Sequence, residues 1–330
     1  MQQERQSNTL FAEIVGQLSA INFLQAALDK QRIAPAYLFA GPEGVGRKLT
    51  TLRFLEGLIN EGSPNKAIRR QLETRNHPDL LWVEPTYSNQ GKIISRSIAQ
   101  KEGLNQRSSS QIRLVQIREL TRFLGKKPLE AKGGIIVIED LELIREEAAN
   151  ALLKILEEPR NGLFILLTSR PEKILETIKS RCQKVPFYSL NEICFQKVLM
   201  RIKSQPQSSL PFELSNTLDC RELINMSNGC PGELIVNLKV WENLPEDLLN
   251  NLFNLPHEPI GALTLAREIT EKLNHEEQVW IIKWLEESIW HKTKNDLAMR
   301  RLEKLHSHLL SYVNPRLAWE LALIELIQMN

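Results

Sequence analysis

The sequence predicts an α/β domain built on a parallel, doubly wound sheet, followed by an all-helical region. Up to about residue 187, short apolar strand patterns alternate with amphipathic helical patterns, as expected when crossover helices join parallel strands. A glycine-rich turn follows the first buried strand pattern, and from Leu190 onward only helical periodicity remains. We therefore expect three domains, with boundaries at 1–187, 188–243 and 244–330.

The elements of the first domain follow in order along the chain. Apolar periodicity over 20–28 predicts a helix, and a buried strand over 36–40 precedes a helix that begins at Leu49. A short strand over 78–84 and an amphipathic helix over 112–124 come next. The remaining expected elements are a core strand over 134–138, a helix over 145–158 that Pro159 ends, a strand over 163–168, and a helix leading to 179–182.

The segment from Pro85 to Gln111 differs from its surroundings. It is rich in Ser, Gln, Asn and Gly, and it carries the scattered cations Lys92, Arg96, Lys101 and Arg107. This composition favours a mobile loop or insertion. The alternative is an arm that contacts the backbone of a nucleic acid.

The region after Leu190 predicts helices with short turns between them. The expected helices of a small second domain cover 192–203, 211–219 and 220–227, and a further one begins at Glu233 after a turn. A polar stretch near 242–246 is the expected linker to a second helical domain. The three tryptophans within 277–290 lie on or near one helix face, which is more typical of a core or subunit interface than of a base-stacking platform with interleaved basic residues.

Composition excludes several classes of protein. With 330 residues, 42% hydrophobic and 25% charged, the chain has ordinary globular content. No apolar run reaches membrane-spanning length and no signal-peptide pattern opens the chain, so we expect a cytoplasmic protein without membrane partners. The net charge of +2 does not by itself indicate nucleic-acid binding. The four cysteines and six histidines show neither zinc-ligand nor disulfide spacing.

Residues 41–48, GPEGVGRK, begin as a phosphate-binding loop and depart from it at the last two positions. In the pattern G-x-x-x-x-G-K-[ST], the lysine reaches phosphate oxygens and the hydroxyl ligates Mg²⁺. Gly41 and Gly46 keep the spacing, but Arg47 replaces the lysine and Lys48 the hydroxyl, where a cation would repel the metal. We predict a P-loop-derived turn without hydrolysis. The alternative is a strand-to-helix turn that never contacts a nucleotide.

An acidic pair, Glu139 and Asp140, follows the core strand over 134–138. At this end of a parallel strand, an intact site places an Asp on the nucleotide's metal and then a Glu as catalytic base. Here the order is inverted, which displaces each carboxylate by about one methylene from its working position. The favoured interpretation is a pair of acids that cap the strand end, and the alternative is residual metal binding.

Six short runs together resemble the bacterial clamp-loader branch of the AAA+ superfamily, most closely its δ′-type members. They are FAEIVGQ at 11–17, AYLFAGP at 36–42, HPDL at 77–80, NALLKILEEP at 150–159, SRC at 180–182 and NPRLAWE at 314–320. The resemblance is dense over the first domain and reaches the last helix, while the middle of the C-terminal domain matches only in helical character. It implies an AAA+ P-loop-type domain, a small helical lid and an all-helical collar domain for oligomerisation.

The resemblance also implies a function. Such subunits belong to the DNA polymerase III holoenzyme, a DNA-directed DNA polymerase and thus a nucleotidyltransferase complex, and help to load the sliding clamp on primed DNA during replication. A hetero-pentamer is implied, with a γ/τ-type ATPase neighbour and a δ-type subunit. Within Ser180-Arg181-Cys182, Arg181 would act as a trans arginine finger that stabilises charge in the neighbour's ATP site. The alternative for Arg181 is an exposed arginine that pairs with a local carboxylate.

Several departures from the active pattern agree with one another. ATP-hydrolysing relatives contact the γ-phosphate with a lid arginine, and the matching position here is Gly232. Together with Arg47, Lys48 and the inverted acid pair, this implies weak or absent ATP binding and no turnover. The family's zinc module is missing because no cysteine precedes Cys182, so no zinc is expected. Two alternatives remain: an active γ/τ-type ATPase motor that uses Arg47 as its phosphate cation, and a stand-alone DNA-binding scaffold.

Overall fold

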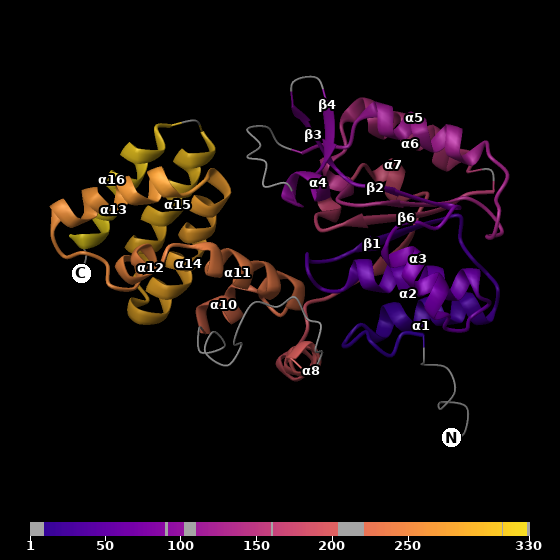
Figure 1. The fold of residues 1–330 in the computed structure, drawn as a ribbon, viewed down its shortest axis with the longest axis horizontal. Helices are drawn as coiled ribbons and strands as arrows, with labels where there is room; N and C mark the ends of the chain where they lie inside the picture. Colours follow the sequence, from indigo (N-terminus) through magenta and orange to yellow (C-terminus); the bar gives the residue numbers. More distant parts are fainter. Residues whose placement is uncertain are drawn as a thin grey trace. The chain divides into compact units, whose positions relative to one another are not determined.

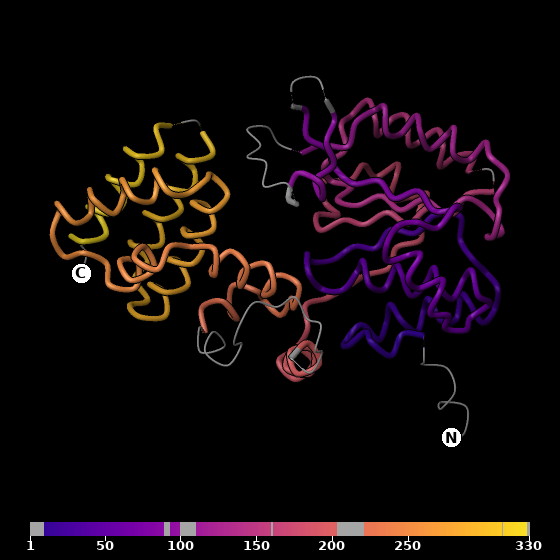
Figure 2. The backbone as a smooth tube through the Cα atoms, viewed as in Figure 1, coloured from indigo at the N-terminus to yellow at the C-terminus, as the bar shows by residue number. Residues whose placement is uncertain are grey.

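A computed structural model describes residues 10–89, 92–101, 110–159, 161–203, 221–311 and 313–328. The chain divides into two compact units, Met1–Met200 and Arg201–Asn330, each considered by itself. Figure 1 shows the elements of both units and Figure 2 the path of the backbone. The predicted fold class is confirmed: the first unit contains a parallel sheet flanked by helices, and the second is helical throughout its described residues.

The first unit is organised around a five-stranded sheet in the order β2-β5-β6-β1-β7, with every neighbouring pair parallel. Its strands are β1 (Ala36–Ala40), β2 (Leu80–Val83), β5 (Ile135–Ile138), β6 (Leu163–Thr168) and β7 (Gln183–Pro186). Since all strands run the same way, the residues after Ala40, Val83, Ile138 and Thr168 share one edge, which we call the carboxyl edge. The residues just before the strands share the opposite, amino edge.

Helices cover both faces of this sheet, as Figure 1 shows. On one face lie α1 (Leu18–Asp29), α2 (Arg47–Ile59) and α3 (Lys66–Glu73); on the other lie α5 (Leu114–Leu124), α6 (Glu146–Glu157) and the short α7 (Glu176–Lys179). The strands β1, β5 and β6 are consequently buried along their whole length, which is why they read as continuous apolar runs. Two 3-10 turns, Leu141–Leu143 and Pro171–Lys173, follow β5 and β6.

The prediction of a loop over 85–111 is wrong for much of that segment. The elements found there are β3 (Thr86–Asn89), β4 (Lys92–Ser95) and α4 (Arg96–Lys101). The two strands pair antiparallel, and reciprocal backbone hydrogen bonds between Thr86 and Gln111 close the base of the segment. Local hydrogen bonding has overridden the polar composition. We call residues 85–111 the insertion; 90–91 and 102–109, including Arg107, lie outside the described residues.

The helices of the second unit agree with the sequence pattern. They are α10 (Arg221–Met226), α11 (Pro231–Asn243), α12 (Glu246–Phe253), α13 (Pro259–Lys272), α14 (His275–Thr293), α15 (Asp296–Leu310) and α16 (Pro315–Ile327), and α8 (Glu192–Lys203) spans the boundary between the units. The helix expected over 211–219 lies outside the described residues. Only 244–245 separate α11 from α12, where a polar linker was expected. The three-domain division stays a prediction.

The tryptophans of α14 are mainly core residues. Trp280 and Trp284 are 8% and 1% exposed, and both rings pack against Trp241. Phe253 meets Trp241 and Trp284 edge-on. Trp290, at 42% exposed, is the outward member of the run. The core interpretation therefore holds for two of the three, because aromatic rings at this spacing bury large apolar areas against each other.

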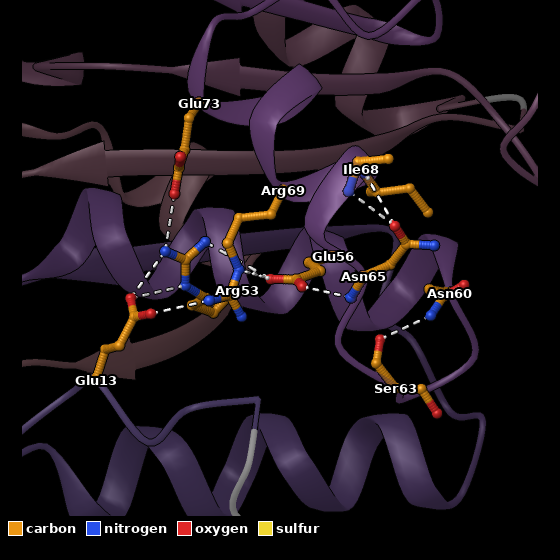
Figure 3. A network of polar contacts seen from close by, with 10 residues as sticks. Glu13, Arg53, Glu56, Asn60, Ser63, Asn65, Ile68, Arg69 and Glu73 are labelled. Carbon is orange, nitrogen blue, oxygen red and sulfur yellow. Dashed lines mark hydrogen bonds and ion pairs between the residues drawn. The ribbon is translucent and has the colours of Figure 1, made fainter.

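A polar network fixes α2 and α3 to the N-terminal segment (Figure 3). At its centre, the fully buried Glu56 carboxylate accepts a hydrogen bond from Arg69 Nε at 2.9 Å and lies 3.6 Å from Arg53. Arg53 also donates to Glu13 and Glu73, both at 2.8 Å. Arg69 reaches Glu13 as well, at 2.8 Å. Buried charges need such compensation, so this network holds α2, and with it the turn that precedes it, in a fixed position.

Candidate functional site

The turn between β1 and α2 requires glycine at two positions. The Gly41 N–H donates to the Thr168 carbonyl at 3.2 Å, and a Cβ on Gly41 would lie 2.3 Å from the carbonyl oxygen of Phe187. Gly46, which caps α2, has φ of +105°, a left-handed conformation that side chains disfavour. The two glycines of the predicted P-loop are therefore explained by backbone geometry: one permits a close approach and the other a left-handed cap.

Arg47, at the lysine position of the motif, is buried in the first turn of α2. It is 7% exposed, and its Nη1 has no hydrogen-bond partner among the described residues. Burial lowers the pKa of the guanidinium, while the negative charges of Glu142 and Asp140 act in the opposite direction. Arg47 thus lies among the carboxylates of the carboxyl edge.

Lys48, at the hydroxyl position, is paired with Glu139. Its Nζ lies 2.5 Å from Glu139 Oε2, and the Glu139 side chain is only 4% exposed. The other oxygen, Oε1, accepts hydrogen bonds from Trp82 Nε1 at 2.5 Å and from Arg75 Nη2 at 3.0 Å. The Arg75 guanidinium also lies 4.9 Å above the Trp82 ring, a cation–π distance. Both oxygens of Glu139 are therefore engaged within the chain.

Asp140 and Glu84 are paired in the same way. Asp140 adopts a left-handed backbone conformation with φ of 47°, and its Oδ2 lies 2.9 Å from Nη1 of Arg96, from the insertion. Burial raises the pKa of the Asp140 carboxyl, against the lowering effect of Arg96. Glu84 accepts a hydrogen bond from the Ser97 hydroxyl and lies 3.3 Å from Arg75 Nη1.

The end of the neighbouring strand β6 is also satisfied internally. Glu142 accepts hydrogen bonds from the Thr168 hydroxyl at 2.8 Å, from the Ser169 N–H at 3.1 Å and from the Ser169 hydroxyl. Burial tends to raise the pKa of Glu142, but these hydrogen bonds hold it below its usual value. Glu142 thereby links the turn after β5 to the end of β6.

Arg181 lies at the opposite, amino edge. In the parallel pair of β1 and β7, Gln183 aligns with Tyr37 and Pro186 with Ala40. Arg181 precedes this strand, whereas the P-loop follows Ala40. Arg181 and the chain's own P-loop therefore lie at opposite ends of the paired strands β1 and β7.

Local contacts hold the Ser180-Arg181-Cys182 triplet in place. Arg181 donates to the Thr177 carbonyl at 2.9 Å and to Glu157 Oε1 at 2.7 Å, with the Arg181 and Glu157 side chains 34% and 52% exposed. The Ser180 hydroxyl donates to the same carbonyl at 3.1 Å. Burial raises the pKa of the Cys182 thiol to about 12, as expected of a side chain packed against the core. In the isolated chain, Arg181 thus pairs with a local carboxylate, the alternative stated from the sequence.

The sequence-predicted site residues fall into separate groups. Lys48 and Glu139 are in direct contact, while Arg181 lies at the other edge. Gly232 lies in the first turn of α11, in the second unit. Sequence reasoning missed Arg75 and Trp82, which carried no motif signal. Arg96 was noted only as a scattered cation of the insertion; its distance from Asp140 in sequence concealed the pair.

Within the described ranges, His, Cys, Asp and Glu side chains form no group of three or more that could hold a metal ion. Among the same residues, no helix combines the length and apolar character that a membrane span requires.

Two family models match the chain and together cover most of it. The model described as DNA polymerase III, delta subunit, matches residues 16–191. The model described as cyanobacterial DNA polymerase III delta prime, C-terminal domain, matches residues 196–326. The first match covers more than half of the chain.

Individual relatives agree with these matches. The δ′ subunit of DNA polymerase III from Bacillus subtilis is 29% identical over 215 residues, 63% of this chain and 55% of the relative. The γ/τ subunit of DNA polymerase III from Mycobacterium bovis is 31% identical over 200 residues, 59% of this chain and 31% of the relative. The matched region thus spans about half the length of the δ′ relative and less of the γ/τ relative.

One solved structure supports the fold over nearly the whole chain. It is a DNA polymerase III gamma subunit-related protein from Thermotoga maritima, with a TM-score of 0.56 and 18% identity over 92% of this chain and 98% of that chain. At this identity, the similarity concerns the fold.

Proposed function

The chain belongs to the δ′ family of DNA polymerase III clamp-loader subunits, and from this premise we propose that it is a non-hydrolysing stator that donates Arg181 in trans. In this proposal, a hetero-pentamer with γ/τ-type and δ-type subunits opens a sliding clamp and places it on primed DNA in the cytoplasm. A γ/τ-type neighbour hydrolyses ATP beside Arg181. The chain's own site binds ATP weakly or not at all.

The position of Arg181 is the observation that carries this proposal. Four residue pairs align β1 with β7 between Arg181 and the P-loop, roughly 13 Å of strand at ~3.3 Å per residue. An arginine finger must contact the transferring phosphoryl group, so Arg181 cannot serve the P-loop of its own chain. Its side chain, held locally by the Thr177 carbonyl and one exposed carboxylate, is instead available to a neighbouring subunit.

The residues at the chain's own site do not fit a magnesium–nucleotide complex. Lys48 supplies an ammonium where the motif needs a hydroxyl, and it already contacts Glu139. The next hydroxyls of α2 offer no substitute, because Thr50 donates to the Gly46 carbonyl and Thr51 to the Arg47 carbonyl, both at 3.0 Å. Mg²⁺ requires oxygen ligands in octahedral geometry, so this set supports a site without turnover.

Contact with DNA is supported by exposed cations along α5 and the segment after it. Five exposed cations form no ion pair with any described residue: Arg118, Arg122, Lys126, Lys127 and Lys132. Unpaired lysines and arginines are the groups that bind a phosphate backbone with release of counterions. The small net charge of the whole chain conceals this local excess.

Assembly through the second unit is supported by apolar side chains that remain exposed on two packed helices. Ile260 of α13 is 75% exposed, and Leu317 and Leu321, one turn apart on α16, are 61% and 44% exposed. Residues four apart share one face of a helix. An outward apolar face of this kind is typical of a surface covered by another subunit.

The test is hydrolysis of ATP by the reconstituted assembly. Arg181→Ala should lower turnover at the adjacent site by about 10³-fold without preventing assembly, because the guanidinium stabilises transition-state charge. Arg181→Lys should recover little, since an ammonium lacks the planar fork. Lys179→Ala is the matched control: it removes a cation of the same edge that pairs locally with Glu176 at 2.8 Å. Unchanged turnover in the Arg181→Ala assembly would exclude the finger role.

The alternative is an active motor subunit, kept open by the similarity to γ/τ relatives. It requires the isolated chain to bind Mg·ATP tightly and to turn it over steadily. The proposed stator does neither. Lys48 distinguishes the two hypotheses, because it stands where a motor site needs a metal-ligating hydroxyl.

A further inference from the structure

We infer that Lys48 is an internal counter-ion, whose ammonium takes the place at the carboxyl edge that the divalent cation of a bound nucleotide would need. The positive charge of Lys48 thereby replaces that of a metal ion, so the P-loop turn needs no ligand. This inference rests on the proposed function and deepens it, because it names the device that closes the chain's own site.

The first step is the burial of Glu139. With 4% of its side chain exposed, this carboxylate has lost nearly all of its water and must be compensated by positive charge and hydrogen bonds. In nucleotide-hydrolysing sites, a metal ion performs that task at the end of this strand. Here Lys48, whose side chain is 60% exposed, does so from the first turn of α2 at 2.5 Å, together with Arg75 at 3.0 Å.

The second step is the use of both oxygens. Oε2 faces Lys48, and Oε1 is occupied by Trp82 and Arg75. Since Oε1 already accepts two hydrogen bonds, a metal at Glu139 would have to bind Oε2, where the Lys48 ammonium lies.

The third step is the charge balance of the whole cluster. Three cations, Lys48, Arg75 and Arg96, contact three carboxylates, Glu84, Glu139 and Asp140. These three pairs balance one another, and the buried Arg47 lies beside Asp140 and Glu139 as well, so a divalent ion would add two positive charges next to four existing cations.

The three cations come from different parts of the chain. Lys48 belongs to α2, Arg75 follows α3, and Arg96 begins α4 in the insertion. The cluster therefore links the P-loop helix, the strand ends and the insertion at one place. Lys48 is the member of the cluster that ties the P-loop helix to Glu139, since Arg75 and Arg96 lie in later parts of the chain.

The experiment measures the thermal midpoint of the isolated full chain with and without millimolar MnCl₂. The natural chain should show no Mn²⁺ response. Lys48→Ala should lower the midpoint by about 3 °C and gain a Mn²⁺-dependent recovery, because Oε2 of the buried Glu139 then lacks its cation and only Arg75 remains, at Oε1. The double variant Lys48→Ala/Glu139→Gln should lose that recovery, which localises the effect. Lys48→Arg should behave like the natural chain.

Lys272→Ala is the matched control. It removes a lysine from an exposed pair with Glu268, 3.7 Å apart, and should change neither the midpoint nor the Mn²⁺ response. If Lys48→Ala does not fold, Lys48→Gln keeps the stem of the side chain and takes its place. A natural chain stabilised by Mn²⁺ as strongly as the variant would overturn the inference, and so would a Lys48 variant with an unchanged midpoint. Because the isolated chain is used, either failure leaves the Arg181 experiment in the assembly unaffected.

Discussion

At the carboxyl edge of the sheet, both oxygens of the nearly buried Glu139 are engaged by contacts within the chain, whereas at the amino edge Arg181 pairs with one exposed carboxylate and one backbone carbonyl. The first arrangement is costly to open, since each broken contact leaves the buried Glu139 carboxylate with only part of its compensation. The second is cheap to exchange, because an exposed ion pair contributes little to stability.

This difference distinguishes charged side chains that stabilise the chain itself from one that is available to a neighbouring subunit. A side chain that is to contact a neighbouring subunit must leave its local partner without unfolding anything, and Arg181 meets that condition. The side chains around Glu139 do not. The same sheet can thus close one site and present a cation for another at its opposite edge.

The largest difference in stability is expected between two substitutions that each neutralise a carboxylate, one at each edge. Glu139→Gln should lower the free energy of unfolding by about 3 kcal/mol, because the donors of Lys48, Arg75 and Trp82 all lose a charged acceptor at a side chain that is 4% exposed. Glu157→Gln should cost about 0.5 kcal/mol or less, since its pair with Arg181 is exposed. Urea unfolding of both variants measures the difference. Equal costs would contradict the distinction between the edges.

A second buried carboxylate, Asp79, allows a sharper test at the amino edge. It is 5% exposed and accepts N–H hydrogen bonds from Leu129 at 2.8 Å, Glu130 at 2.6 Å and Ala131 at 2.7 Å. Asp79→Asn should cost about 2 kcal/mol at neutral pH, because an amide NH₂ then faces backbone donors. The cost of losing Asp79 would show that burial, and not the edge as such, determines how firmly a charge is held.

The same residue predicts a dependence on pH. Burial tends to raise the pKa of Asp79, but the three N–H groups hold it below the ordinary value. A lowered folded-state pKa stabilises the protein above the unfolded pKa of about 3.9 and loses that contribution as the pH falls through the folded value. The stabilities of Asp79→Asn and the natural chain should therefore converge below pH ~4. A gap that stays constant in acid would show that the carboxylate charge is not the cause.

The smallest effect is expected from the insertion. Arg96 is 35% exposed and pairs with Asp140, so Arg96→Ala should cost about 1 kcal/mol or less. Amide exchange in β3 and β4 should become faster, because Arg96 ties the insertion to the strand end. Unchanged exchange there would mean that the Thr86–Gln111 closure alone holds the insertion.

The sequence predicted best the elements with strong periodicity or full burial. The strands over 36–40 and 163–168 and the helix over 192–203 were predicted with the bounds that the structure has. Long apolar runs leave few other arrangements, because they must be buried on both faces. The Lys48–Glu139 contact was not predicted. The sequence indicated only that Lys48 would repel a metal.

The missed elements share weak local signals. The strand β7 is an edge strand of four residues whose first two are exposed, and α3 is mostly polar. The insertion was read as a loop because its composition is polar, although hydrogen bonding between β3 and β4 orders its described part. The partners of Glu139 and Asp140 are set by tertiary contacts between distant segments. No spacing in the sequence records such contacts.

The most direct measurement of the division between the two edges is ATP hydrolysis by one reconstituted assembly carrying either Lys48→Ala or Arg181→Ala. If this chain serves its neighbour's site and not its own, Arg181→Ala should lower turnover at the adjacent site by about 10³-fold, while Lys48→Ala leaves turnover there within about twofold of the natural assembly. A large loss with Lys48→Ala and none with Arg181→Ala would contradict the account, because ATP would then be hydrolysed at the chain's own site at the carboxyl edge.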